Sequence, residues 1–263
     1  MESRFSIVST ISSTPLLATL LLAAALADQP PVPRVTMPRM KTPPTIDGVI
    51  DEEEWQHAVR NCGLVSHTTG VLSSRQGVFW LGSDGANVYV AVKTEAPPDG
   101  RILTRAVPDA DRDLPAAFLD DSLELVLDPK RDRPEGDRTY YHLITNARGA
   151  LYDWAVDPDN RQDPKDLGWR VRDRQLAQSV VDGWWHAEIA IPVAGLGVTP
   201  DDYARPWGVR VARNWRRPGE QSQWAAGSPS YDDRATMPLV GWDDSAPVVR
   251  VLSLHQQWQR PRI

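Results

Sequence analysis

The sequence predicts an all-β protein: an antiparallel β-sandwich, jelly-roll or immunoglobulin-like, with one short helical turn. Three observations predict it. About ten short segments are apolar or alternate apolar and polar residues with a period of two, as β-strands do. Turn residues, among them Ser83-Asp84-Gly85, separate these segments. Helical periodicity is weak throughout the 263 residues, which argues against layers of helices.

The clearest predicted strand covers residues 122–128 (SLELVLD). Successive side chains of a strand point to opposite faces. The alternation therefore gives one face with Leu123, Leu125 and Leu127, and another with Ser122, Glu124 and Val126. Because the leucine face is apolar, the segment predicts a strand with one buried face.

Two hairpins and several further strands complete the expected sandwich. Residues 77–81 are expected to pair with 87–92, and residues 140–146 with 150–156, each pair across a turn that contains Gly. Further strands are expected at residues 169–173, 179–181, 184–191, 207–213, 222–225 and 248–254. The helical turn is expected at residues 51–59, since its acidic start suits the helix dipole.

The ends of the chain predict export. Arg4 precedes an apolar run at residues 15–27, and Ala25-Leu26-Ala27 supplies the small residues of a cleavage site, so residues 1–27 are interpreted as a signal peptide. The run is shorter than the about 20 residues of a membrane span. We expect a secreted protein, extracellular or periplasmic, without membrane attachment after cleavage. Its expected parts are a Pro-rich leading segment that is a linker or an edge segment (28–44), one β-sandwich (45–245), and a terminal strand and tail (246–263).

The composition excludes several classes of protein. There are 29 Lys and Arg against 35 Asp and Glu, a net charge of −6, whereas a nucleic-acid binder needs a positive field. The single cysteine, Cys62, cannot form an internal disulfide. HExxH, GxSxG, phosphate-loop and CxxC motifs are missing from the sequence. The 11 Trp against 3 Phe indicate a use for large, flat, amphipathic rings, such as a binding surface.

The tryptophans divide by position. Trp55 is expected to hold the helical turn against the sandwich. Those within strand segments are expected in the core: Trp80, Trp185, Trp207 and Trp224. Those at strand ends or on outer faces are candidates for a binding platform: Trp154, Trp169, Trp184, Trp215 and Trp242.

Five blocks, in a fixed order and at fixed intervals, carry a resemblance to a known family. They are IDGVIDEEEW at residues 46–55, DDSLELVLDP at 120–129, YYHLITNARGALYDW at 140–154, GWWHAEIAIPVAGLG at 183–197, and WGVRVARN at 207–214 followed by QW at 223–224 and YDD at 231–233. Together they resemble the family 9 carbohydrate-binding modules, over roughly residues 40–245.

The resemblance implies a β-sandwich in which two aromatic rings clamp a sugar and polar side chains bind its hydroxyl groups. Glu124 corresponds to the sugar-binding carboxylate of that family. Phe118 and Tyr231 lie at or near the positions of the clamp rings. A simpler interpretation also stays open, in which Phe118 belongs to the core and Tyr231 packs within a loop.

The chain departs from the family on the strand at residues 140–146. Ile144 occupies the position where the resemblance implies an arginine, so we consider Arg148 or Arg213 as a replacement. Asn146 and Asn214 are candidates for amide contacts with a sugar, with turn or strand-end caps as the alternative.

The resemblance further implies structural calcium, with Asp47, Asp51 and Asp121 as candidate ligands, and no organic cofactor. The expected partner is a plant-type polysaccharide or oligosaccharide, xylan or glucan, bound in support of carbohydrate catabolism. A separate glycoside hydrolase is a further candidate partner.

Three other functions are kept as hypotheses. One is an exported glycoside hydrolase that uses Glu124 with Asp121 or Asp153, although the sequence specifies no acid/base pair. Another is a haem-binding sandwich, for which Met37, Met40 and Met237 are the thioethers remaining after signal cleavage. The last is a structural domain that has lost sugar binding, which the Ile144 departure would fit.

Overall fold

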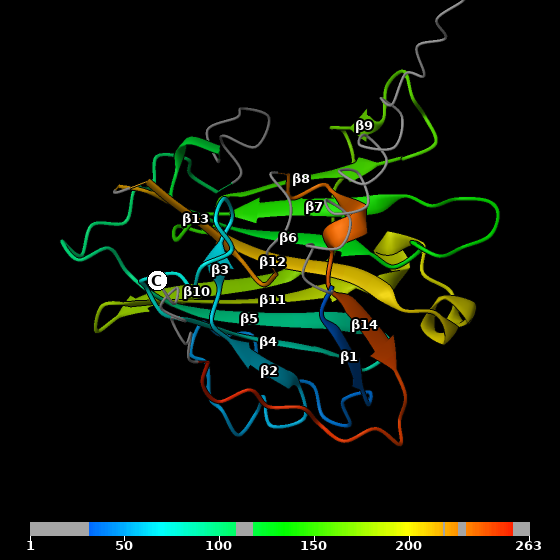
Figure 1. Cartoon of the computed structure of the whole chain (residues 1–263), viewed down its shortest axis with the longest axis horizontal. Coiled ribbons are helices and arrows are strands. Elements are labelled where there is room, and N and C mark those ends of the chain that lie inside the picture. Colours follow the sequence, from blue (N-terminus) through cyan, green and yellow to red (C-terminus); the bar gives the residue numbers. More distant parts are fainter. Residues whose placement is uncertain (1–31, 109–117, 218, 226–229, 255–263) are drawn as a thin grey trace, which may run out of the picture. The chain divides into compact units, whose positions relative to one another are not determined.

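The computed structural model describes residues 32–108, 118–217, 219–225 and 230–254. These residues belong to one compact unit, Val32–Ile263. They form two β-sheets that pack face to face (Figure 1). The predicted all-β sandwich is therefore confirmed. The signal-peptide prediction at residues 1–27 and Trp258 lie outside the described residues. Within the described part, no helix is long and apolar enough to cross a membrane.

The larger sheet, sheet A, has the strand order β1-β14-β12-β6-β7-β8-β9, and β13 pairs with both β12 and β3. Its strands are β1 (Arg34–Met37), β3 (Val65–Ser66), β6 (Ser122–Asp128), β7 (Tyr140–Thr145), β8 (Leu151–Val156), β9 (Lys165–Asp166), β12 (Trp207–Arg216), β13 (Gly219–Gln223) and β14 (Leu239–Trp242). Neighbours are antiparallel except β1, which runs parallel to β14. The Pro-rich leading segment thus supplies an edge strand.

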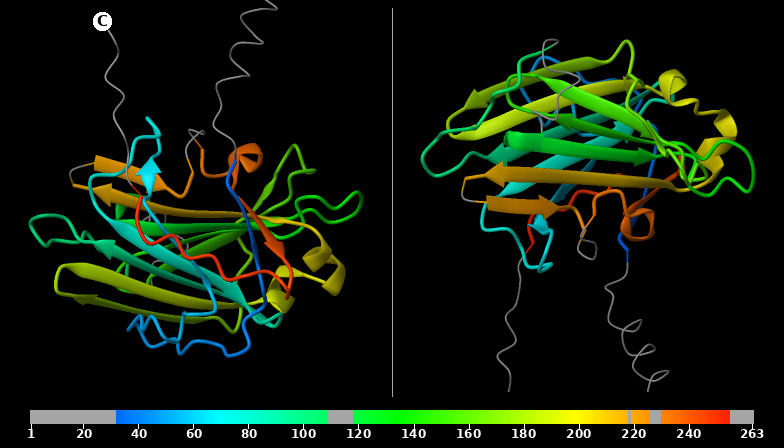
Figure 2. Two further views of the ribbon diagram at one scale, coloured as in Figure 1. Left: turned by 60° about the horizontal axis from the view of Figure 1, so that its bottom comes forward. Right: turned by 90° about the horizontal axis from the view of Figure 1, so that it is seen from above.

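Sheet B has the strand order β10-β11-β5-β4-β2. Its strands are β2 (Val59–Cys62), β4 (Gly77–Ser83), β5 (Asn87–Glu95), β10 (Gln175–Val181) and β11 (Trp184–Pro192). Short 3₁₀ turns follow at η2 (Val193–Leu196) and η3 (Pro200–Ala204), and another, η4 (Arg234–Thr236), precedes β14. Figure 2 shows the two sheets in two further views, one with the bottom of Figure 1 turned forward and one from above.

The main core lies between the facing sides of the two sheets. Sheet A contributes the leucines of β6, namely Leu123, Leu125 and Leu127, and sheet B contributes Phe79, Val90 and Ile189, among others. The four tryptophans predicted for the core are buried: Trp80, Trp185, Trp207 and Trp224. Trp185, Trp207 and Trp224 lie in the main core, whereas Trp80 packs in a separate cluster with Trp55 and Tyr89. Burial of the three rings in the main core favours the packing of the two sheets.

The predicted hairpins and most of the predicted strands are confirmed, with three differences. Residues 169–173 form no strand; instead β9 and β10 lie on either side of them. Residues 248–254 make only an isolated bridge, between Arg250 and Arg60. Residues 52–58 form successive turns and no regular helix, and Val59 begins β2. The local apolar pattern of these segments is short, and such a pattern does not distinguish a strand or helix from a loop.

The turns at residues 51–58 are held by sheet B through a buried carboxylate. Trp55 is fully buried, and its Nε1 donates to Glu188 Oε1 at 3.0 Å. Glu188 Oε2 accepts from Gly48 N at 2.8 Å. Gly48 has φ 89°, and a Cβ there would lie 3.1 Å from the backbone of Gln178, so the turn requires glycine. Trp55 therefore fastens this segment to the sandwich, as expected.

The prediction that β6 has a single buried face is wrong. The leucine face lies in the main core as expected, but every residue of β6 is buried. The opposite face is covered by a second cluster that includes Val126, Tyr140 and Met237. Residues 230–237, here called the covering segment, contribute Tyr231 and Met237 to this cluster. Such long-range cover leaves no signal in the local alternation of a strand.

Candidate functional site

The side of sheet A that faces away from sheet B, here called the outer face, gathers the candidate polar residues. Glu124 on β6, His142 on β7 and Asn214 on β12 all point to this side, because each alternates with core-facing neighbours. The pairing register places Glu124 opposite Ile144 and Ala212. Three strands that are distant in sequence thus bring these groups together.

His142 joins two carboxylates on the outer face. Its Nε2 lies 2.7 Å from Glu124 Oε2, and its Nδ1 lies 2.9 Å from Asp232 Oδ1. Burial acts to lower the pKa of His142, but the hydrogen bonds to Asp232 and Glu124 outweigh it and raise the pKa above its ordinary value. For Asp232 burial acts to raise the pKa, yet the bond to His142 holds it below the usual range. The two hydrogen bonds therefore favour the protonated form of His142.

Asn214 orders the other side of Glu124. Its Nδ2 donates to Glu124 Oε1 at 2.5 Å and to Ser122 Oγ at 3.1 Å. Its Oδ1 accepts from the Tyr231 hydroxyl at 3.0 Å. Tyr231 is 8% exposed, and burial raises the pKa of its hydroxyl. The ring of Tyr231 meets His67 edge-on, with the centroids 4.9 Å apart.

An aromatic cluster borders this polar network. Phe118 contacts Tyr152 and Trp154, with centroid separations of 5.7 and 5.8 Å. Trp154 in turn lies 4.1 Å from the ring of His142. Phe118 is 38% exposed, so its ring is the part of the cluster that a ligand reaches first. Phe118 and Tyr231 therefore have different aromatic neighbours, and the clamp that they would form stays a prediction.

Buried donors without a partner among the described residues also lie on this side of sheet A. They are Trp154 Nε1, Arg210 Nε and Gln223 Nε2. Arg210 is fully buried, and burial lowers its pKa to about 10. Its Nη2 donates to Thr236 Oγ1 in the covering segment at 2.8 Å. Buried donors of this kind usually have a partner, so their presence favours a polar ligand or water in this region.

Asn146 and Arg148 lie at the turn between β7 and β8. Asn146 is fully buried, and its Oδ1 accepts from Arg148 N and Ala150 N at 3.0 and 3.1 Å. Its Nδ2 donates to Ala106 O and Asp120 Oδ2 at 2.9 and 2.8 Å. The amide therefore holds the turn in this structure, which is the cap interpretation. The side chain of Arg148 is exposed at the same turn.

Arg213, considered as a replacement for the arginine absent at Ile144, points to the opposite side. It is fully buried, and its Nη1 donates to Thr94 Oγ1 of β5 at 2.6 Å. Its Nη2 lies 2.6 Å from Glu220 Oε1. Burial lowers the pKa of Arg213 to about 10. Arg213 therefore links sheet A to sheet B, and it does not present its guanidinium on the outer face.

The three candidate calcium ligands serve backbone N–H groups in two separate regions. Asp47 Oδ1 accepts from Val49 N and Asp51 Oδ1 from Glu53 N, beside sheet B. Asp121, directly before β6 of sheet A, accepts from the backbone N–H groups of residues 103 and 216. The described residues contain no group of three or more His, Cys, Asp or Glu that could hold a metal. These residues do not fit one shared site, and calcium stays a prediction of the resemblance.

The arrangement bears on the other functions considered. Asp153 is fully buried and lies on the core side of β8. Both oxygens of Asp121 accept backbone N–H groups. Neither carboxylate therefore faces Glu124 across a cleft. The hydrolase hypothesis gains no support from these pairs.

The haem hypothesis gains no support from the methionines. Three different hydrophobic clusters contain Met37, Met40 and Met237, so these residues supply no pair of thioethers for haem.

Sequence reasoning missed two central residues of the site, His142 and Asp232. Both occur in the sequence within blocks that carry the family resemblance, His142 in YYHLITNARGALYDW and Asp232 in YDD. The available signal was the alternation of β7, which places His142 on the same side as Ile144. The position of Asp232 depends on the covering segment and has no local signal.

Comparison with known proteins identifies the fold. Neither a protein-family model nor a curated protein matches this chain. A protein of Bacteroides uniformis to which carbohydrate binding has been ascribed superposes with a TM-score of 0.60 at 13% identity, over 81% of this chain and 100% of that chain. A family 9 carbohydrate-binding module of Caldicellulosiruptor kristjanssonii superposes with TM-scores of 0.53 in its glucose complex and 0.54 in its cellotriose complex. Both matches have 15% identity and cover 85% of this chain and 100% of that chain. This chain therefore has the β-sandwich fold of the family 9 carbohydrate-binding modules.

Proposed function

We propose that this protein binds carbohydrate on the outer face of sheet A, beside Phe118 and Glu124. One observation carries the proposal: a positioned carboxylate lies next to an aromatic cluster with an exposed ring, in a sandwich whose structural neighbours bind sugars. Pyranose rings have apolar C–H faces that pack on aromatic rings and hydroxyl edges that need charged or amide partners.

Glu124 is suited to receive a hydroxyl group. A carboxylate has about four acceptor positions. His142 and Asn214 each engage one oxygen of Glu124, so acceptor positions remain for a ligand. Because both partners fix the carboxylate before binding, a sugar hydroxyl would not have to order it.

The covering segment sets the access to this carboxylate. Glu124 is 7% exposed and Tyr231 is 8% exposed. Contact between Glu124 and a sugar therefore requires a shift of Tyr231 and Asp232, whereas Phe118 is reachable as it stands. We infer a modest affinity, since the sugar has to displace contacts that the protein already makes.

The finer assignment follows the glucose and cellotriose bound by the structural neighbours. We propose a plant-type glucan or xylan as the ligand, bound by an exported protein that supports carbohydrate catabolism beside a separate glycoside hydrolase. Cellotriose is the ligand to test first.

Isothermal titration calorimetry with glucose, cellotriose and xylotriose tests the proposal. Binding of an oligosaccharide should weaken at least tenfold in Phe118→Ala and in Glu124→Gln. Val49→Ala is the matched control, because Val49 is 61% exposed in the segment beside sheet B. Absence of binding to all three sugars by the folded protein would refute carbohydrate binding at this face.

A further inference from the structure

A second hollow, separate from the outer face, lies at the β9 edge of sheet A. It has a volume of about 770 Å³. Ligand pockets for small molecules range over about 300–1,000 Å³, so the space suits a di- or trisaccharide. It is formed by the β8–β9 hairpin, the chain that follows β9, and the start of β7, and is here called the hairpin hollow.

The hairpin hollow lies on the other side of sheet A from Glu124. Tyr141 and Ala155, which line it, belong to the main core cluster and alternate with the outer-face residues His142 and Trp154. A sugar on the outer face would contact Phe118, whereas a sugar in the hairpin hollow would contact Trp169. The two regions therefore do not share an aromatic ring for sugar binding. A ligand in the hairpin hollow would be independent of one beside Phe118.

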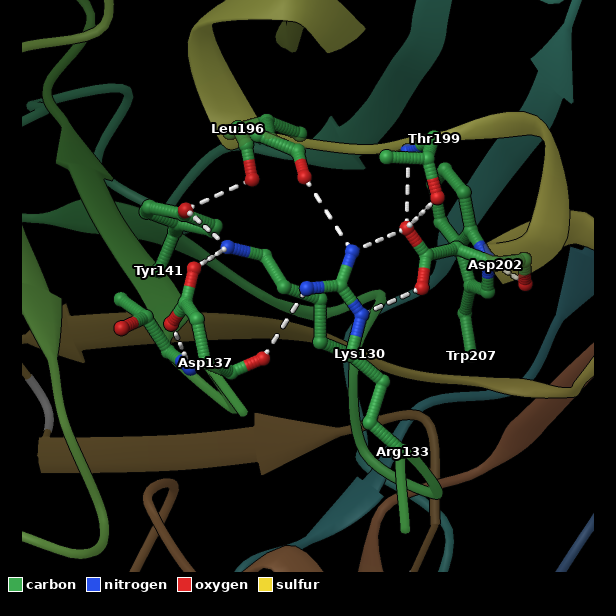
Figure 3. A network of polar contacts seen from close by, with 10 residues as sticks. Lys130, Arg133, Asp137, Tyr141, Leu196, Thr199, Asp202 and Trp207 are labelled. Carbon is green, nitrogen blue, oxygen red and sulfur yellow. Dashed lines mark hydrogen bonds and ion pairs between the residues drawn. The ribbon is translucent and has the colours of Figure 1, made fainter. Parts of the chain in front are cut away.

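Aromatic rings form the apolar wall of the hairpin hollow. Trp169 is partly buried, and its ring lies 4.6 Å from that of Tyr141 at an interplanar angle of 36°. Tyr141 is held by Lys130, whose Nζ lies 3.0 Å from the Tyr141 hydroxyl and 2.5 Å from Asp137 (Figure 3). The Tyr141 hydroxyl also donates to Leu196 O at 2.7 Å. The wall is thus fixed by a buried network before any ligand arrives.

The polar wall is the β8–β9 hairpin, which is also fixed by its own hydrogen bonds. Asp157 N donates to Pro164 O at 2.8 Å, and Asn160 Nδ2 donates to Asp163 O at 2.6 Å. Three carboxylates, of Asp157, Asp163 and Asp166, line the hollow. Lys165 also lines it, but its Nζ lies 3.6 Å from Asp232 Oδ2 on the outer face. This charge disfavours uronates and phosphates. Carboxylates accept hydrogen bonds from hydroxyl groups, so an uncharged polyol suits this lining.

We propose that the hairpin hollow is a second carbohydrate site, which takes an uncharged di- or trisaccharide with one sugar ring packed on Trp169. The aromatic wall receives the C–H face of the sugar, and the carboxylates receive its hydroxyl groups. The proposal does not depend on sugar binding at the outer face.

The test uses the Phe118→Ala protein, in which we expect binding at the outer face to be weakened at least tenfold. Cellotriose and xylotriose are titrated while backbone amide and indole NMR signals are recorded. We expect millimolar binding, with shifts confined to residues 139–141 and 155–169. Trp169→Ala should weaken this binding at least tenfold. Asp159→Asn is the matched control, since Asp159 lies in the same hairpin but pairs with Arg138, and its effect should stay within twofold.

Several outcomes would overturn the proposal. One is the absence of shifts in residues 155–169 for both sugars in a folded protein. Another is a set of NMR shifts in these residues that calcium chloride or glucosamine causes but uncharged sugars do not. That result would show that the hollow binds cations. If Trp169→Ala fails to fold, the NMR shifts of the Phe118→Ala protein alone decide. A failure of the proposed outer-face site would be seen separately, because the wild-type and Phe118→Ala proteins would then bind the oligosaccharide with the same affinity.

Discussion

His142 lies between Glu124 and Asp232, with Nε2 2.7 Å from one carboxylate and Nδ1 2.9 Å from the other. Glu124 belongs to β6, whereas Asp232 belongs to the covering segment 90 residues further along the chain from His142. One imidazole therefore fastens the covering segment to the carboxylate at the centre of the proposed sugar site. The stability of this cluster and the access to Glu124 are coupled through His142.

We predict that this cluster makes folding depend on pH. The pKa of His142 is raised in the folded protein, so its stabilisation is fully present below about pH 6.5, the unfolded value, and is lost as pH rises through the folded pKa. Urea unfolding between pH 5 and 9 measures it. His142→Gln should cost about 3–5 kcal/mol at low pH, because it removes the cation beside the buried carboxylate of Glu124. The exposed His57→Gln is the control, and equal pH profiles for wild type and His142→Gln would contradict the prediction.

A second prediction concerns Asp153 in the core. Burial raises its pKa to about 6 from 3.8, against the opposing hydrogen bond from Val171 N at 2.7 Å. The protonated carboxyl group of Asp153 is favoured in the folded protein. Its contribution to the free energy of unfolding is therefore fully present below about pH 4 and declines as pH rises to about 6. Asp153→Asn should remove this decline and stabilise the protein at pH 7 by about 1–3 kcal/mol. Denaturation curves at pH 4 and 7 check it, with the exposed Glu135→Gln as control. A loss of stability at pH 7 would show that the carboxylate is required.

A third prediction concerns the link between the sheets at Arg213. Its guanidinium bonds Thr94 of sheet B, and also Ser73 Oγ and Glu220 Oε1, each at 2.6 Å. Arg213→Met leaves the Glu220 carboxylate without its cation and should cost about 3–5 kcal/mol. Arg213→Lys should recover only part of this, because an ammonium cannot reproduce the planar set of donors. Thermal unfolding measures both, with the exposed Arg217→Met as control. Full recovery by lysine would contradict the need for several guanidinium donors.

A fourth prediction concerns Glu188 beneath the turns at residues 46–55. Its carboxylate accepts from Trp55 Nε1 and from the N–H groups of Gly48 and Asp47 at 3.0, 2.8 and 3.2 Å. In Glu188→Gln one side-chain oxygen still accepts a hydrogen bond, but the new NH₂ group faces N–H donors that it cannot bond. The substitution should therefore lower the free energy of unfolding by about 1–3 kcal/mol. Trp55→Phe should reduce the effect of Glu188→Gln in a double-mutant cycle. Additive effects in that cycle would argue against the shared contact.

The predictability of the site differs between its residues. Glu124 could be placed on the side of β6 opposite the leucines, because strand alternation is a local property. The role of Asn146 could not be decided, since a cap and a ligand contact use the same amide and only the positions of Ala106 and Asp120 distinguish them. Strand alternation places Arg213 on the side of β12 opposite Asn214, which is the core side. A buried charge at such a position could not be predicted from the sequence, because its partner Thr94 belongs to the other sheet.

The sequence by itself determined the sandwich, its hairpins and the two sides of β6, because these follow from residue alternation and turn chemistry over a few neighbouring positions. The tertiary structure decided which polar groups meet. It covered the outer face with residues 230–237, joined His142 to Asp232, and enclosed the hairpin hollow between Trp169 and the β8–β9 hairpin. These contacts join segments that are distant in the chain, and their geometry depends on the packing of the whole sandwich rather than on any local pattern.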